Sequence, residues 1–149
     1  HNHPDWIWDG VRFHFFSLQA LSKTKSKNNS SCVLQISTKK GKALLTGDIE
    51  KSAETHLIKA YKEQLASQVL IVPHHGSKTS SSYRFLLEVS PLYAIASLGF
   101  DNRFHFPHAQ TLKNLQSLKI PFFRTDTCGM VEVLLPRSGK VKRPQCFTS

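Results

Sequence analysis

The sequence predicts an α/β protein, a layered sandwich in which short apolar strands alternate with helices. Residues 68–73 and 92–97 are brief apolar stretches, which are typical of buried strands. Residues 51–66 and 108–118 instead place apolar side chains three and four positions apart, as amphipathic helices do. A chain that alternates between these two patterns packs layers of helices on a sheet.

Length and composition are those of a single domain with a real core. The chain has 149 residues, and 40% of them are hydrophobic, including ten Phe. Its longest purely aliphatic run, 69–72, is far too short to cross a bilayer. No positively charged stretch followed by an apolar run opens the chain, so we expect no signal peptide. Work outside the cytoplasm would then require another segment to carry the domain there.

Three strands are expected first, and a helix follows them. A polar, Lys-rich loop (19–29) separates the first two strands, and a Lys-Lys-Gly turn (39–41) joins the second to the third. The strands are predicted over 10–18, 31–38 and 42–46. Ser52 is the expected cap of the helix over 51–66, whose inward face carries Ala53, Leu57, Ile58, Tyr61 and Leu65.

The remaining chain alternates strands with helices and ends in a strand pair. We predict strands over 68–73 and 92–97, helices over 82–89 and 108–118, and closing strands over 122–126 and 130–135. The last helix points Leu112, Leu115 and Leu118 inward, and Cys128-Gly129 turns the closing pair. The predicted order is βββαβαβαββ over 1–135, followed by a basic tail over 136–149.

The charge balance is strongly basic. Twenty Lys and Arg against ten Asp and Glu give a formal charge of +10. Such an excess favours a polyanionic partner, or it serves only solubility. The cations cluster in three stretches that look like loop, turn or tail: 23–27, 39–42 and 137–143.

The three cysteines form no Cys-x-x-Cys pair, which excludes a zinc knuckle and a thioredoxin-like motif. Their odd number argues against a disulfide scaffold, although it does not fix the compartment. Cys32 lies in an apolar run and is expected to pack as a small hydrophobic side chain.

Asp48 follows a strand directly, after Thr46-Gly47. Gly47 permits a sharp turn, and the Asp48 carboxylate would then project from the strand end, where its two oxygens are able to bridge two cations. The alternative is an ordinary Gly-Asp turn or a helix cap, because a helix follows closely.

His74 and His75 follow the next buried strand and precede Gly76-Ser77. Neighbouring residues on an extended chain face opposite sides, so one histidine would face a site while the other supports it. Neutral imidazole binds zinc or manganese, and the following Gly and Ser allow an anion to approach the backbone. A pair of partly exposed loop histidines is the alternative.

Several segments resemble, in order and spacing, the metallo-β-lactamase-like domain of the ComEC family of DNA-uptake channels. The resemblance rests on W-I-W-D-G-V (6–11), N-N-S-S-C-V-L (28–34), L-L-T-G-D-I-E (44–50), V-P-H-H-G-S-K-T-S-S-S (72–82), N-R-F-H-F-P-H (102–108) and R-T-D (124–126) with Gly129. It implies the C-terminal half of an αββα sandwich. His105 and Phe106 depart from the family pattern N-R-Y-G-H-P-H.

The chain also opens with H-N-H-P-D-W, which is similar to the start of the family's metal run H-x-H-x-D-H. In the family that run lies well upstream of W-x-W-D-G-V, whereas His1, His3 and Asp5 directly precede Trp6. Trp6 also takes the place of the final histidine, and no strand precedes the run. We therefore interpret it as a coincidence and expect the upstream ligands to be missing from this chain.

The resemblance implies roles for individual residues. Asp48 would bridge two metal ions, Zn or Mn, and His75, or else His74, would bind one of them. Five residues are implied phosphate contacts: Ser31, Ser77, Thr79, Arg103 and His108. Glu54 and Asp126 are expected to be a helix-face charge and a turn residue. A catalytic metal needs about three protein ligands, so the chain alone is expected to be inactive.

Three functions remain open at this stage. The first is a piece of a metal-dependent phosphodiesterase that degrades or guides DNA, single-stranded above all, in an inner-membrane channel whose domain faces the periplasm. The second is a DNA-binding module without catalysis, and the third is another metallohydrolase, such as a lactamase or thioesterase. An uncovered sheet face would also favour a homodimer.

Overall fold

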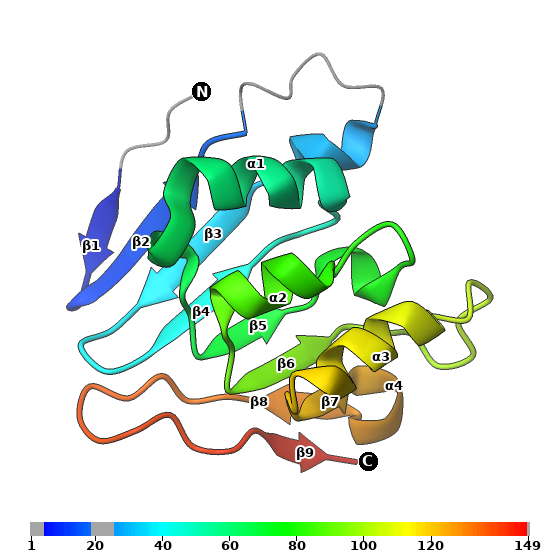
Figure 1. Cartoon of the computed structure of the whole chain (residues 1–149). Coiled ribbons are helices and arrows are strands. Elements are labelled where there is room, and N and C mark those ends of the chain that lie inside the picture. Colours follow the sequence, from blue (N-terminus) through cyan, green and yellow to red (C-terminus); the bar gives the residue numbers. More distant parts are fainter. Residues whose placement is uncertain (1–4, 19–25, 149) are drawn as a thin grey trace.

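The computed structural model describes residues 5–18 and 26–148 and confirms the α/β class (Figure 1). Seven strands form one sheet in the sequential order β1 to β7, and two more form a small separate sheet. The large sheet comprises β1 (Trp6–Trp8), β2 (Val11–Phe16), β3 (Val33–Ser37), β4 (Lys42–Leu45), β5 (Val69–Ile71), β6 (Tyr93–Ala96) and β7 (Phe122–Arg124). The small sheet pairs β8 (Met130–Glu132) with β9 (Gln145–Phe147).

The connections explain the pairing. Strands β1 to β4 pair antiparallel, whereas β4 to β7 pair parallel because a helical segment carries the chain back each time. The helices are α1 (Lys51–Tyr61), α2 (Tyr83–Val89), α3 (Ala109–Ser117) and the single turn α4 (Thr125–Cys128). Figure 1 shows α1, α2 and α3 on one face of the sheet. No helix in the part of the chain that the structure describes has the length and apolarity to span a membrane.

Each face of the sheet has its own core, because adjacent strand residues point to opposite sides. On the helix side, Leu44 and Leu70 pack with the inward residues of α1, α2 and α3. On the other side, Val69 and Ile95 pack against Val141 of the C-terminal segment. That segment is therefore an integral layer of the fold.

The first helix is shorter than predicted. It ends at Tyr61 because Lys62 adopts a positive φ of 45°, and a 3-10 helix, η3 (Lys62–Leu65), continues it. The expected cap at Ser52 is wrong, since Glu50 precedes the helix and the Ser52 hydroxyl instead accepts a hydrogen bond from Asn29. Ser82 does cap α2, accepting from the Phe85 N–H.

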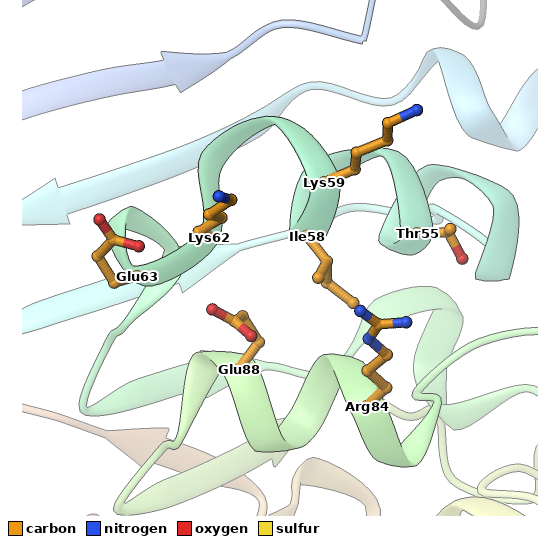
Figure 2. A pocket seen from close by; sticks show the side chains of 7 residues that line it. All are labelled: Thr55, Ile58, Lys59, Lys62, Glu63, Arg84 and Glu88. Carbon is orange, nitrogen blue, oxygen red and sulfur yellow. The ribbon is translucent and has the colours of Figure 1, made fainter.

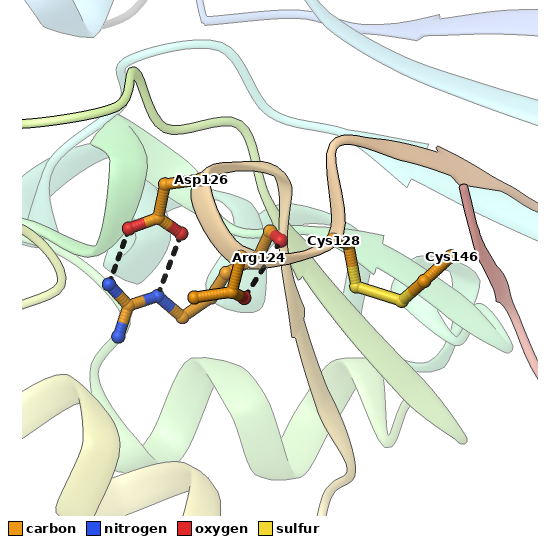
Figure 3. Close-up of a disulfide and its surroundings, with 5 residues drawn as sticks. Arg124, Asp126, Cys128 and Cys146 are labelled. Atoms are coloured by element: carbon orange, nitrogen blue, oxygen red, sulfur yellow. Dashed lines mark hydrogen bonds and ion pairs between the residues drawn. A yellow bond between two sulfur atoms is a disulfide. The ribbon is translucent and has the colours of Figure 1, made fainter. Parts of the chain in front are cut away.

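The predicted closing strand pair is also wrong. β7 pairs with β6, because α3 acts as a crossover connection, and β8 pairs with β9 from the supposed tail. A disulfide between Cys128 and Cys146 ties these segments, contrary to the inference from the odd cysteine count (Figure 3). Residues 136–148 are thus not a simple tail, since they contain β9, and Cys32, expected to be packed, is exposed.

Two acidic residues also differ from expectation. Glu54, expected on a helix surface, is fully buried and accepts hydrogen bonds from the backbone N–H groups of Ser81 and Ser82. Its carboxylate fixes the Ser-rich segment that leads into α2. Asp126 lies in α4, where both its oxygens bind the Arg124 guanidinium, and this contact lowers the pKa of Asp126 (Figure 3).

Candidate functional site

The candidate site lies where three parallel strands end. β4, β5 and β6 run in the same direction, so the residues that follow them meet at one edge of the sheet. Asp48 follows β4, His74 and His75 follow β5, and Ser97 follows β6. The structure thus brings together the polar residues that the sequence places after separate strands.

Asp48 and His75 face one another across this edge. The Asp48 Oδ1 lies 3.5 Å from the Nε2 of His75, and their side chains are 48% and 46% exposed. The pair is therefore held by the protein on one side and is open to solvent on the other. A carboxylate oxygen and an imidazole nitrogen at this separation are able to approach one cation together.

The other ring nitrogen of His75 is already occupied. Nδ1 lies 2.7 Å from the backbone carbonyl oxygen of Ser97, so it donates its hydrogen there. The tautomer with Nδ1–H leaves Nε2 as an acceptor that points toward Asp48. Histidines that bind metals are oriented in this way by a second hydrogen bond.

His74 belongs to a second, neighbouring network. Its Nδ1 lies 3.8 Å from Glu50 Oε1 and 3.5 Å from the Thr79 hydroxyl. Thr79 donates to Glu50, and the Ser77 hydroxyl lies 3.1 Å from that of Thr79. The two histidines thus face different carboxylates, and Ser77 and Thr79 hydrogen-bond within the protein.

Glu50 is ionised in this network. Hydrogen bonds lower the pKa of its carboxyl, first that from Ser26, with further ones from Asn28 and Thr79, and His74 acts in the same direction. Glu50 was not singled out from the sequence. Its position two residues after Asp48, at the same strand end, is the sequence feature that would have indicated a place in the site.

The segment 28–31 frames the loop that carries both carboxylates. The Asn29 side chain accepts from the Glu50 N–H, and the Ser31 hydroxyl accepts from the Asp48 N–H. Gly47 has a φ of +55°, and a Cβ there would lie 2.9 Å from the Ser31 Cβ. Ser31 therefore supports the backbone of the carboxylate loop.

The histidine turn has a different backbone from the one predicted. His74 and His75 both have positive φ angles, 48° and 55°, so the chain turns sharply and is not extended. The two rings nevertheless face different partners. Hydrogen bonds on both sides hold the turn: the His74 N–H donates to the Gly47 carbonyl, and the Gly76 carbonyl accepts from His108.

The loop before α3 provides a pocket of about 400 Å³ beside His75. Arg103 lines this pocket, with its guanidinium 5.3 Å from the centroid of the Phe104 ring. His108 has a structural contact: its Nδ1 accepts from the Gln110 N–H and caps α3. Of the two predicted phosphate contacts in this loop, Arg103 is an exposed guanidinium, whereas one ring nitrogen of His108 is already used to cap α3.

The described residues supply too few donors for a complete metal site. Asp48 and His75 are two donors, and no group of three His, Cys, Asp or Glu residues able to hold a metal ion occurs over residues 5–18 and 26–148. The opening histidines, His1 and His3, lie outside these ranges. Asp5 is bound to His14, with 2.6 Å between carboxylate oxygen and Nδ1. Two donors fit a metal centre only if further ligands join them.

A second pocket, of about 510 Å³, lies between α1, η3 and α2 (Figure 2). Its lining mixes cations with carboxylates and contains none of the predicted site residues. The lining residues are Thr55, Ile58, Lys59, Lys62, Glu63, Arg84 and Glu88. We therefore place the candidate site at the strand ends.

No protein-family model matches the chain. It is 40% identical over 134 residues to "Competence protein ComA" of Neisseria gonorrhoeae, covering 90% of this chain and 19% of that protein. It is 39% identical over 122 residues to "ComE operon protein 3" of Bacillus subtilis, covering 82% and 16%. It is 36% identical over 129 residues to "Recombination protein 2" of Haemophilus influenzae, covering 87% and 16%.

These similarities extend over most of the chain, although the chain spans less than one fifth of each relative. They agree with the resemblance found in the separate sequence segments, of which 44–50 and 72–82 contain the residues that follow β4 and β5. The chain therefore belongs to the ComEC family of competence proteins.

Proposed function

We propose that this chain is part of a metal-dependent phosphodiesterase domain that acts on DNA during uptake by a competence channel. The observation that carries the proposal is the Asp48–His75 pair, with Nε2 of His75 left as an acceptor by the bond to Ser97. Asp48 and His75 would hold zinc or manganese together with ligands from outside this chain. The metal would polarise a phosphodiester and activate water.

The fold and the charge support this proposal. A sheet with helices on one face and a second apolar core on the other suits half of an αββα sandwich, whose other half would supply the missing ligands. The formal charge of +10 suits a polyanionic substrate. The Cys128–Cys146 disulfide suits an oxidising compartment such as the periplasm, outside an inner-membrane channel. Dimerisation through the sheet face stays a prediction.

A DNA-binding module without catalysis is the second candidate. It is favoured by the shortage of metal donors among the residues that the structure describes. Such a module would bind DNA through Lys and Arg alone and would need no metal. The two candidates therefore differ in whether Asp48 and His75 bind a cation.

The test is metal binding by this chain. We expect calorimetry to show weak binding of Zn²⁺ or Mn²⁺. Asp48→Asn and His75→Gln should each lower the metal affinity by at least about tenfold, because even the loss of a residue that only supports a ligand has an effect of this size. His56→Gln on α1 is the matched control and should bind as the wild type does. The chain alone should not cleave single- or double-stranded DNA with either metal.

Two outcomes would contradict this proposal. Metal binding that both substitutions leave unchanged would remove the metal role of the Asp48–His75 pair and favour the binding module. Robust cleavage by the unmodified chain, abolished by either substitution, would show that a complete site exists without further ligands.

A further inference from the structure

An aromatic row borders the candidate site. The rings of Phe104 and Phe106 are stacked, with centroids 5.5 Å apart and planes at 19°. Phe106 is in turn nearly parallel to the His75 ring, at 6.5 Å and 15°. Three flat rings thus form a row that ends at the histidine facing Asp48.

The outer end of this row is open to solvent. Phe104 is 64% exposed, although a large apolar side chain is usually buried. The Arg103 guanidinium lies over its ring, 5.3 Å from the centroid, and makes no ion pair with the described residues. An exposed ring that carries a cation without an ion-pair partner among these residues suits a ligand with a flat apolar surface and a negative charge. A nucleotide combines these two features.

The loop holds the row in place. The side-chain oxygen of Asn102 accepts from the Phe106 N–H at 2.7 Å, and its amide group donates to the Phe106 carbonyl at 3.1 Å. Phe106 also packs against the helix-side core. The middle ring is therefore fixed, so a partner of Phe104 meets a surface that is already ordered.

We infer that this row is a stacking platform for a base of single-stranded DNA. One base stacks on Phe104, the adjacent phosphate meets Arg103, and the strand continues past His75 toward Asp48. In a duplex the base faces are covered by their neighbours, so the platform selects an unpaired strand. The inference rests on the proposed function for the path of the strand, but base stacking itself needs no metal.

The test compares the affinity of the protein for two 12-nucleotide single-stranded DNAs in the presence of a chelator: dT12 and an abasic oligonucleotide of equal length. Fluorescence anisotropy should show tighter binding of dT12 by the wild type. Phe104→Ala should weaken dT12 binding by about 5- to 100-fold, which is the usual loss for one stacked base. Phe104→Trp should restore the preference, because it keeps a flat ring.

Phe100→Ala is the matched control. Phe100 lies in the same loop and is 92% exposed, but it does not line the pocket beside His75. This variant should retain the preference for dT12. Circular dichroism of Phe104→Ala should match the wild type, since an exposed ring adds little to the fold.

Three results would overturn the inference: wild-type binding that does not distinguish dT12 from the abasic strand, no loss in Phe104→Ala, or an equal loss in Phe100→Ala. None of them depends on Asp48 or on metal. Conversely, loss of the metal role of Asp48 and His75 in the calorimetric test would refute the proposed function and leave the stacking result intact.

Discussion

The backbone carbonyl of Ser97 fixes the ring of His75, which donates its Nδ1 hydrogen across 2.7 Å. This contact joins the residues that follow β5 and β6. We predict that neutral His75 is the tautomer with hydrogen on Nδ1. Nitrogen-15 NMR of the imidazole should show an unprotonated Nε2, whereas a protonated Nε2 would mean that the Ser97 bond does not form in solution.

Glu54→Ala should lower the free energy of unfolding by about 1–3 kcal/mol, because the buried N–H groups of Ser81 and Ser82 lose their acceptor. Urea unfolding near pH 5 measures the difference. Glu63→Ala, on an exposed residue of η3, is the control and should change little. Equal stability of both variants would show that the Ser-rich segment does not depend on the buried carboxylate.

The stability that depends on Glu54 should also fall as the pH rises. Burial raises the pKa of Glu54 above its usual 4.5, so the folded state holds this proton more tightly than the unfolded chain does. The contribution is fully present below pH 4.5 and is lost as the pH rises through the raised pKa. Relative to Glu54→Gln, which does not titrate, wild-type stability should decline as the pH rises above 4.5 and through the raised pKa of Glu54. A relative increase would mean that the two N–H donors outweigh burial.

Loss of the disulfide should destabilise the fold by about 3 kcal/mol, the amount expected for a closed loop of this size. The cysteines are 18 residues apart in the sequence. Thermal unfolding of Cys128→Ser with Cys146→Ser should show a lower melting temperature, together with faster proteolysis near Arg137 and Lys142. Cys32→Ser, at the exposed free cysteine, should behave as the wild type. A double variant that melts like the wild type would show that the bridge adds no stability.

The sequence predicts the strands best where apolar residues are continuous, as in β5 and β6, because buried parallel strands have few alternatives. It also places Asp48 and His75 at one edge, since the ends of parallel strands coincide. It places β7 and β8 correctly along the chain but pairs them wrongly, because two strands separated by a short turn suggest a hairpin. Only the crossover through α3 and the distant cysteine pair override that local pattern.

Contacts that depend on tertiary packing are also missed. A glutamate on an amphipathic helix usually faces water, and only the return of residues 81–82 over α1 makes Glu54 a buried acceptor. The contact between His75 and Ser97 uses the backbone carbonyl of Ser97, which every residue type has, so the sequence does not reveal it. The role of Asn102 depends on the conformation of its loop, so the motif that contains this residue does not reveal it.

The C-terminal segment fixes the position of four of the twenty Lys and Arg residues: Arg137, Lys140, Lys142 and Arg143. Val141 is buried, the Pro136 carbonyl accepts from the Thr38 hydroxyl, and Arg143 lies over the Phe123 ring. A mobile basic tail would sample many orientations and could bind a polyanion from any direction. Here the segment that carries these four cations is held against the sheet through Val141, so their part of the electric field has a fixed orientation and would orient an approaching polyanion before contact.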